Sequence, residues 1–255
     1  MLLCVDIGNT NIVMGAYDDD TLQFVARCAT DKRRTADQYA VELCSILALN
    51  NCDRDSFDGA IVSSVVPPLL PTIKAAINRI LGCKVMTISP GIKTGLNIKI
   101  DNPAILGSDL VCGAVAAISV YKPPCVLIDL GTATKISGID KFGNFVGCSI
   151  LPGIGISLDA LSSGTAQLPH IEFDSASNII GTNTVDSMRS GVVFGTASMI
   201  DGMIRKYRSV LGDEASVIAT GGYSSVIIPF CETDIILDQN LVLNGLRQIY
   251  YKNNG

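Results

Sequence analysis

The sequence predicts an α/β fold made of two similar lobes, each with a mixed β-sheet flanked by helices. The first observation is a repeated pattern, in which an apolar run ends in Asp-x-Gly and a short polar turn follows, at residues 6–10 and 129–134. The second is the order of elements expected in the first half, β-β-β-α-β-α-β, which is typical of an α/β domain. Because the repeat indicates an internal duplication, we divide the chain into lobes at residues 1–120 and 121–255.

The first copy of the repeat begins with the apolar run at residues 2–5, which predicts a strand, a tight turn and a second strand. Gly8 allows the backbone to approach a ligand closely. Asn9 and Thr10 can donate hydrogen bonds to phosphate oxygens. Asp6 cannot bind phosphate, but its carboxylate can hold a magnesium ion that does.

The second copy, residues 126–134, aligns with the first as DLGTATKI against DIGNTNI. Two unrelated turns are the alternative interpretation, since Asp, Gly and Asn also favour turns for local reasons. The match between the copies favours a shared task instead. We therefore expect the two turns to grip a polyphosphate and its metal from both sides of a nucleotide cleft between the lobes.

The remaining elements of the first lobe follow from apolar periodicity and from turn residues. Strands and helices are expected, in chain order, at residues 21–29 (strand), 35–49 (helix), 60–66 (strand), 69–81 (helix), 85–88 (strand) and 107–121 (helix). Residues 89–106 are rich in Gly, Pro and Asn. An irregular segment of this length inside a compact domain suggests that it carries function.

The second lobe is expected to mirror the first. After the second hairpin, the sequence predicts a strand at 145–150, a turn at 152–155, helices at 157–161, 184–211 and 241–251, and a strand at 217–220. Thr184 is the expected N-cap of the long helix. Gly191, Gly195 and Gly202 fall near one face of that helix, where another element could approach closely.

Composition excludes several classes of protein. The chain has 48% hydrophobic and 17% charged residues and a net charge of −5, and its basic residues are scattered, which argues for a soluble globular protein without a nucleic-acid interface. Its nine cysteines include no Cys-x-x-Cys pair and lie near no histidine, so neither a zinc site nor a disulfide framework is expected. No signal peptide and no membrane-spanning run is expected, which predicts a cytoplasmic protein.

An ordered set of motifs resembles the type III pantothenate kinases over nearly the whole chain. The motifs are DIGNTN, VSSVVPP, GIKTGL, DNP, GSD, DLGTAT, LPG with a following SLDAL, and Gly181-x-x-Thr184. That family belongs to the superfamily of acetate and sugar kinases, heat-shock ATPases and actin. The resemblance implies two ribonuclease-H-like lobes, ATP-dependent phosphorylation of the primary hydroxyl of pantothenate, the first step of coenzyme A synthesis, and a homodimer formed through the second lobe.

The resemblance also implies a role for each matching residue. ATP would be bound by Asp6, Ile7, Gly8, Asn9, Thr10, Asn11 and Thr132. The acceptor site would comprise Ile100, Gly107, Ser108, Asp109, Leu110 and Thr184. Asp6 would hold Mg²⁺, and Asp129 would be the ligand of a monovalent cation, K⁺ or NH₄⁺. Asp109 would be the catalytic base, although an acid at a helix start can also serve only to stabilise the helix.

Three residues depart from the family pattern. The family usually has Tyr where this chain has Ile100, Arg where it has Leu110, and Thr where it has Lys135. One hypothesis is a working pantothenate kinase in which Lys135 or another group compensates. The second is a divergent paralogue with an altered acceptor or weak activity. A generic sugar or acetate kinase would not explain the GIKTGL and DNP motifs, and a pure interaction module has no need of paired Asp-x-Gly turns.

Overall fold

The computed structural model describes residues 1–173 and 178–254 and divides into two compact units. Unit 1 comprises Met1–Gly95, Asn102–Ala116 and the chain from Leu241 onward, and unit 2 comprises Leu96–Asp101 and Ala117–Asn240. Each unit contains one mixed β-sheet flanked by helices. The predicted α/β fold class with a duplicated mixed sheet is confirmed, and the nucleotide cleft between the lobes stays a prediction.

The sheet of unit 1 has five strands. In spatial order they are β3 (Thr21–Ala29), β2 (Asn11–Asp18), β1 (Leu2–Ile7), β4 (Gly59–Ser64) and β5 (Lys84–Thr87). Strand β1 pairs antiparallel with β2 and parallel with β4, and both pairings continue to Ile7. The carboxyl end of β1 therefore lies between the β1–β2 turn and the residues that end β4.

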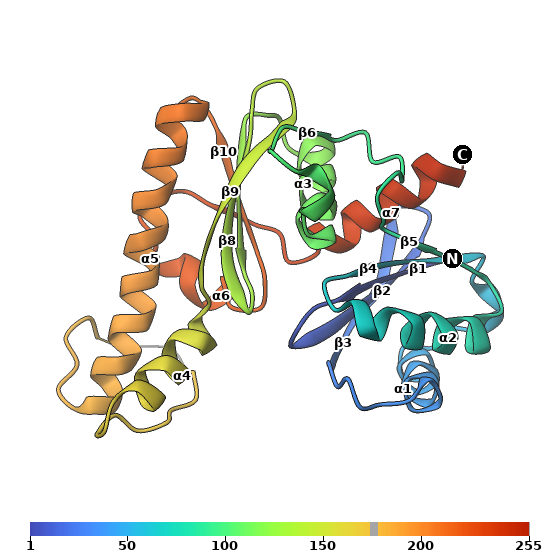
Figure 1. Cartoon of the computed structure of the whole chain (residues 1–255), viewed down its shortest axis with the longest axis horizontal. Helices are drawn as coiled ribbons and strands as arrows, with labels where there is room; N and C mark the ends of the chain where they lie inside the picture. Colours follow the sequence, from blue (N-terminus) through green and yellow to red (C-terminus); the bar gives the residue numbers. More distant parts are fainter. Residues whose placement is uncertain (174–177, 255) are drawn as a thin grey trace. The chain divides into compact units, whose positions relative to one another are not determined.

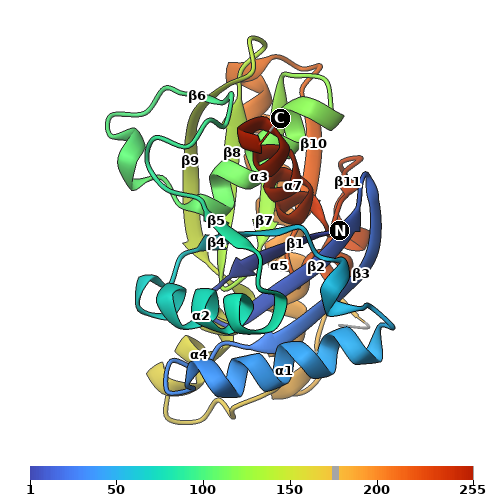
Figure 2. The same cartoon turned by 90° about the vertical axis from the view of Figure 1, so that its right-hand side faces the viewer.

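Helices cover both faces of this sheet. Helices α1 (Ala36–Leu49) and α2 (Leu70–Leu81) pack on one face (Figure 1). Alternate residues of β1, such as Leu3 and Val5, join the buried side chains of these helices in one core. Helix α7 (Leu241–Asn254) packs on the opposite face, since a Cβ at Gly15 or Gly59 would touch its side chains. Figure 2 shows α1 and α2 running side by side along the sheet.

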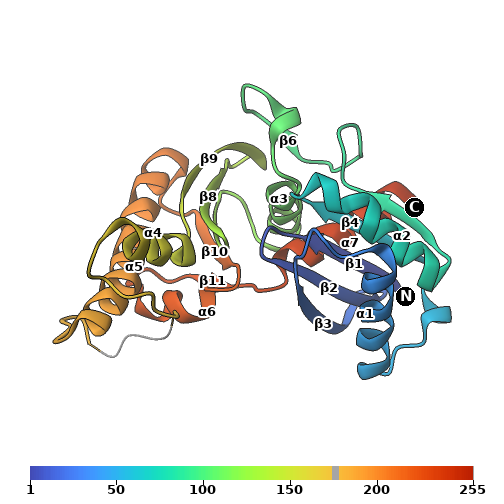
Figure 3. The ribbon, with the colours of Figure 1, turned by 60° about the horizontal axis from the view of Figure 1, so that its bottom comes forward.

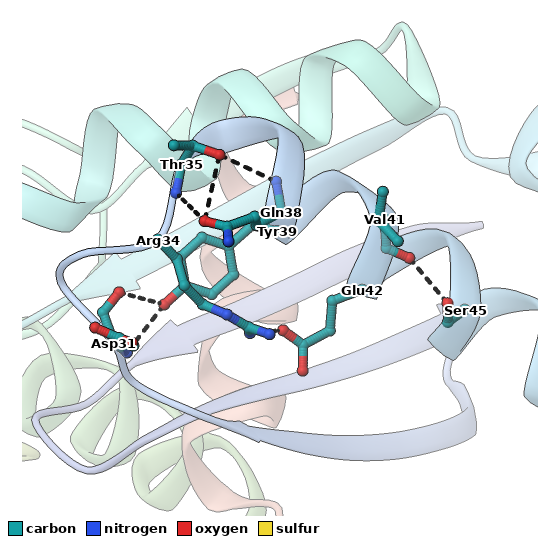
Figure 4. Close-up of polar contacts among 8 residues, drawn as sticks. All are labelled: Asp31, Arg34, Thr35, Gln38, Tyr39, Val41, Glu42 and Ser45. Carbon is teal, nitrogen blue, oxygen red and sulfur yellow. Dashed lines mark hydrogen bonds and ion pairs between the residues drawn. The ribbon is translucent and has the colours of Figure 1, made fainter.

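Helix α1 shows how local sequence sets an element boundary. Thr35 is its N-cap, and its side chain accepts a hydrogen bond from the Gln38 N–H while Gln38 reaches back to the Thr35 N–H (Figure 4). This capping box satisfies backbone donors that the first helical turn leaves unpaired. The Tyr39 hydroxyl also donates to the Asp31 carbonyl oxygen at 2.9 Å. The loop before α1 is thus fixed to the first turn of the helix.

The sheet of unit 2 repeats the arrangement of unit 1. Its strands, in spatial order, are β11 (Ile236–Leu237), β10 (Ser216–Thr220), β7 (Cys125–Leu130), β8 (Ala133–Ile139), β9 (Asn144–Pro152) and β6 (Asn97–Ile98). Strand β7 pairs antiparallel with β8 and parallel with β10, as β1 does with β2 and β4. Strands β1 and β7 even share one burial pattern, residue by residue.

The helices of unit 2 gather on one face of this sheet. Helices α4 (Ile154–Gly164), α5 (Thr184–Leu211) and α6 (Ser224–Ile227) lie there together (Figure 3). Their buried side chains share a core with Val126, Ile128 and Leu130 of β7. Because side chains alternate along a strand, Asp129 lies on the face away from this core.

Helix α3 (Ser108–Val120) matches the helix predicted at 107–121, but other elements differ from expectation. The segment 152–155 is not a separate turn, because α4 already begins at Ile154, whose side chain is buried in the core of unit 2. The N-cap of α5 is Asn183, which accepts a hydrogen bond from the Asp186 N–H at 2.9 Å, so the prediction of Thr184 was wrong by one residue. Residues 89–106 also contain β6, which pairs with β9.

The final helix belongs to unit 1, whereas the predicted division placed residues 121–255 in one lobe. Its buried residues include Leu241, Leu246 and Ile249. A Cβ at Gly245 would lie 1.9 Å from the Cys112 carbonyl oxygen of α3, so α7 and α3 touch backbone to backbone. Among the described residues, no helix has both the length and the apolar character needed to cross a membrane.

Candidate active site

In unit 1, strand β1 carries Asp6 to the turn formed by residues 8–11. The Gly8 N–H donates to the Asn11 carbonyl oxygen at 3.0 Å. A Cβ at Gly8 would lie 2.9 Å from the same oxygen, so a larger residue would distort the turn. Asn9 and Thr10 are exposed at its tip. The tip of the turn is therefore accessible to a ligand, while the hydrogen bond between Gly8 and Asn11 holds the two ends of the turn together.

A residue that the sequence did not single out braces this turn. Thr30, directly after β3, donates from its hydroxyl to the Gly8 carbonyl oxygen at 2.8 Å and from its N–H to the Thr10 carbonyl oxygen at 2.9 Å. These bonds tie the loop to the neighbouring strand. No local motif marks Thr30, because the contact forms only when β3 pairs with β2.

The family resemblance implies that this turn binds ATP, so we expect Thr30→Val to weaken that binding, because valine keeps the shape and the N–H but loses the hydroxyl bond to Gly8. One hydrogen bond contributes about 0.5–1.5 kcal/mol, which corresponds to a rise in the KM for ATP of about 2- to 12-fold. Steady-state kinetics against ATP measures it. Thr21→Val, an exposed threonine at the other end of β3, is the control and should leave KM unchanged; an unchanged KM in Thr30→Val would contradict the bracing role.

The start of α3 is fixed beside β1 by a cluster of serines. Ser63 of β4 is the register partner of Asp6, and its hydroxyl donates to Ser108 Oγ at 2.9 Å. Ser108 Oγ also accepts from the Ser64 N–H and donates to the Ser64 carbonyl oxygen, both at 3.1 Å. Ser108, predicted in the acceptor site, thus holds the first turn of α3 against the end of β4.

Asp109 follows Ser108 in this first turn. Its Oδ1 accepts a hydrogen bond from the Leu110 N–H at 2.8 Å. A Cβ at Gly107 would lie 2.5 Å from that oxygen, so only glycine leaves room for the carboxylate in this orientation. Gly107, Ser108, Asp109 and Leu110 are all partly exposed, which is compatible with contact to a substrate.

The buried thiol of Cys112 shows that Asp6 and Asp109 share one electrostatic environment. Burial raises the pKa of Cys112 well above its ordinary value, and the negative charges of Asp6 and Asp109 raise that pKa further. The geometry agrees, because Ser63, the register partner of Asp6, donates to Ser108, the residue before Asp109. The structure therefore brings together the predicted magnesium ligand and the predicted base, which are far apart in the sequence.

In unit 2, the second turn is one residue shorter, and glycines from outside it pack against it. A Cβ at Gly221, after β10, would lie 2.7 Å from Asp129 Oδ1 and 2.6 Å from the Leu130 carbonyl carbon. Gly221 has a φ of +97°, a conformation that favours glycine. A Cβ at Gly153 would lie 2.1 Å from the Thr132 carbonyl oxygen. Thr132 itself is exposed at the tip. Two glycines distant in sequence thus support the β7–β8 turn.

Asp129 makes an ion pair with Lys135. Their Nζ and Oδ2 atoms are 2.6 Å apart, and only 18% of the lysine and 22% of the aspartate side chain is exposed. The two residues are register partners in the β7–β8 pair. Lys135, which the sequence marked only as a departure from a family pattern, therefore lies at the predicted cation site.

The predicted acceptor residues do not all fall in one unit. Gly107 to Leu110 belong to unit 1, whereas Ile100 and Thr184 belong to unit 2. Thr184, the first residue of α5, lines a cavity of about 770 Å³ together with Gly181, Gly191 and Gly195. Among the described residues, no group of three or more His, Cys, Asp or Glu side chains could hold a metal ion by itself.

Comparison with known proteins now identifies the family. Residues 2–206 match the sequence pattern described as type III pantothenate kinase. The chain belongs to the type III pantothenate kinase family. Curated family members from Halalkalibacterium halodurans and Brevibacillus brevis are both 41% identical over 253 residues, which cover 99% of this chain and 100% and 99% of theirs. The family resemblance seen in the sequence is confirmed.

A solved structure supports the fold of this pantothenate kinase family member. Component A of (R)-2-hydroxyglutaryl-CoA dehydratase from Acidaminococcus fermentans has a TM-score of 0.59 at 14% identity, with 100% of this chain and 99% of that chain covered. At this identity the likeness concerns the fold alone. The family itself is one of phosphotransferases that act on an alcohol group.

Proposed function

We propose that this chain transfers the γ-phosphoryl group of ATP to the primary hydroxyl of pantothenate, the first step of coenzyme A synthesis. The observation that carries the proposal is 41% identity to curated type III pantothenate kinases along nearly the full length of both chains. The contact between Ser63, beside Asp6, and Ser108, beside Asp109, supports it, since phosphoryl transfer needs a metal-binding carboxylate near a proton acceptor.

The proposed reaction assigns each group a task. The exposed polar groups of the first turn and Thr132 bind the phosphates of ATP. The Asp109 carboxylate accepts the proton of the pantothenate hydroxyl as its oxygen attacks the γ-phosphorus. The bond between the γ-phosphorus and the β,γ-bridging oxygen breaks, and ADP leaves with that oxygen. Positioning and charge neutralisation supply most of the rate in such transfers.

The residues of unit 1 fit a magnesium ion that arrives with ATP. Mg²⁺ is commonly held by one or two carboxylates together with waters and substrate phosphates rather than by a full protein cage. Asp6, at the carboxyl end of β1 beside the phosphate-binding turn, is such a carboxylate. When bound, the ion would neutralise charge on the phosphates.

The residues around Asp129 do not fit a monovalent cation. The Lys135 ammonium already contacts Oδ2 at 2.6 Å and supplies the positive charge that the carboxylate needs. We therefore assign no step of the reaction to a bound K⁺ or NH₄⁺.

Turnover tests the function directly. We expect ADP release that depends on pantothenate, with ATP and Mg²⁺ present, and a product heavier than pantothenate by one phosphate in mass spectrometry. Binding of ATP without pantothenate-dependent turnover would instead support the divergent paralogue, in which Ile100 and Leu110 reshape the acceptor site. The 41% identity favours the pantothenate kinase over this alternative.

We also propose a cytoplasmic homodimer in which α5 forms the contact. Among the described residues, no atom lies within 4 Å of a Cβ built on Gly191 or Gly195, and both are exposed on α5. The exposed Ile179 and Ile180 precede the same helix. Small residues beside exposed apolar ones allow a second copy of the helix to approach closely.

A bulky charge at this position tests the dimer. We expect Gly195→Arg to sediment as a monomer, and sedimentation rather than turnover decides, because Gly195 itself lines the Thr184 cavity. Ser198→Arg, an exposed position on the same helix, is the comparison, and circular dichroism checks that both variants fold. A wild-type monomer with full activity would overturn the proposal.

A further inference from the structure

The ion pair between Lys135 and Asp129 stands in place of the monovalent cation that the family resemblance led us to expect at Asp129. Asp129 stands where a monovalent cation was predicted, yet its Oδ2 is 2.6 Å from a lysine ammonium. The contact follows from the sheet. Asp129 and Lys135 face each other across β7 and β8 in the antiparallel register, and directly opposed side chains of a sheet are close enough to interact.

The surroundings leave little freedom for this carboxylate. Ile128 and Leu130 point into the core of unit 2, so Asp129 lies on the other face with Lys135. The positions of a Cβ on Gly131 and on Gly221 fall 3.3 Å and 2.7 Å from Oδ1. Both charged side chains are about four-fifths buried. Glycine at both positions leaves the space beside Oδ1 that a side chain would fill, and Oδ2 carries the ammonium contact.

A bound monovalent cation would compete with the ammonium for the same charge. Two positive charges at one carboxylate oxygen repel each other, and they do so more strongly where solvent is largely excluded. The covalently tethered ammonium also loses less freedom on pairing than an ion taken from solution. Lysine therefore supplies at Asp129 the single positive charge that a potassium or ammonium ion would otherwise supply.

We propose that Lys135 is a built-in counter-ion of Asp129 and makes this protein independent of K⁺ and NH₄⁺. Part of this inference rests on the proposed function, because independence of turnover presupposes turnover. The structural part concerns only whether the site at Asp129 takes up a monovalent cation. It is therefore tested on the folded protein without substrate as well as in the reaction.

The test compares KCl and NH₄Cl with tetramethylammonium chloride, whose cation is too large for the site, at equal ionic strength. For the wild type we expect the same thermal midpoint in all three salts and rates of pantothenate phosphorylation within twofold. For Lys135→Thr we expect a lower midpoint in tetramethylammonium that rises saturably with K⁺ or NH₄⁺, with turnover following it. Lys122→Thr, an exposed lysine of the same unit, should behave as the wild type.

Two further variants separate pairing from packing. Lys135→Met fills the space without charge, so we expect a lower midpoint that K⁺ does not restore. Adding Asp129→Asn to Lys135→Thr removes the charge to be neutralised, and the response to K⁺ should disappear. If Lys135→Thr does not fold in any salt, the wild-type measurement decides alone.

Each failure has a distinct signature. If K⁺ raises the wild-type turnover rate more than twofold, or clearly raises the wild-type thermal midpoint, the counter-ion proposal is overturned. The kinase function would remain intact. A folded Lys135→Thr without any response to K⁺ would also overturn it. A third outcome would overturn the kinase function alone. In it, wild-type unfolding does not depend on the salt and Lys135→Thr responds to K⁺, but neither protein turns over pantothenate.

Discussion

Asp109→Asn is expected to abolish most pantothenate phosphorylation while ATP still binds. Asparagine keeps the size of the side chain and can still accept a hydrogen bond from the Leu110 N–H. It cannot take up the proton of the attacking hydroxyl. A positioned general base contributes about 10²- to 10⁴-fold to rate, so we expect kcat to fall within that range.

The measurement is ADP release at saturating pantothenate, with ATP affinity determined separately by calorimetry. Asp55→Asn, at an exposed acidic side chain of the same unit, is the control and should leave kcat unchanged. A loss confined to the KM for pantothenate, with kcat preserved, would mean that Asp109 positions the substrate without taking its proton. Equal stability of variant and wild type in thermal unfolding would exclude loss of the fold as the cause.

Gly153→Ala is also expected to lower stability and weaken ATP binding strongly, because the structure leaves no space for a methyl group at this position. Its Cβ would lie 2.1 Å from the Thr132 carbonyl oxygen and 2.6 Å from that of Gly131. The φ of Gly153 is −75°, which alanine tolerates, so the clash with the β7–β8 turn, which we propose to bind ATP, is the whole cause. Overpacking of this kind costs about 1–3 kcal/mol, and the turn must shift away from its ligand-binding position.

We expect Gly153→Ala to lower the thermal midpoint and to raise the KM for ATP about tenfold or more, the change that about 1.4 kcal/mol produces. Gly155→Ala is a matched control two positions later. Its Cβ would meet only the Tyr223 hydroxyl, at 3.5 Å, which is an ordinary contact. Since alanine favours helices over glycine, this control should be as stable as the wild type or more so. Equal ATP kinetics in the two variants would contradict the role of the turn.

Local sequence was sufficient for the duplicated hairpins and most helix limits. An apolar run that ends in Asp-x-Gly specifies a strand and a turn through neighbours only, and β1 and β7 indeed have the same burial pattern. The helix predicted at 35–49 also holds, because the Thr35 and Gln38 capping box lies within a single turn. Such signals need no contact with distant parts of the chain.

The loops of the two hairpins differ in length by one residue, and the sequence alignment of the hairpins did not reveal this difference. Aligned by sequence, Lys135 corresponds to Ile12, which faces the core of unit 1 as the partner of Ile7. The loop of the first hairpin spans residues 8–11, whereas that of the second spans 131–133. A shift of one residue turns a side chain to the other face of a sheet. Lys135 therefore meets Asp129 instead of the core.

Contiguous motifs were enough to predict the family and the α/β class, whereas phosphate binding by the two turns stays a prediction. Tertiary contacts were needed to show that α7 packs with unit 1 and that Thr30 braces the first turn. They were also needed to show that Asp6 and Asp109 share the environment of Cys112. Each of these depends on strand register or on packing between segments far apart in the chain, and such contacts exist only once the hydrophobic core has formed.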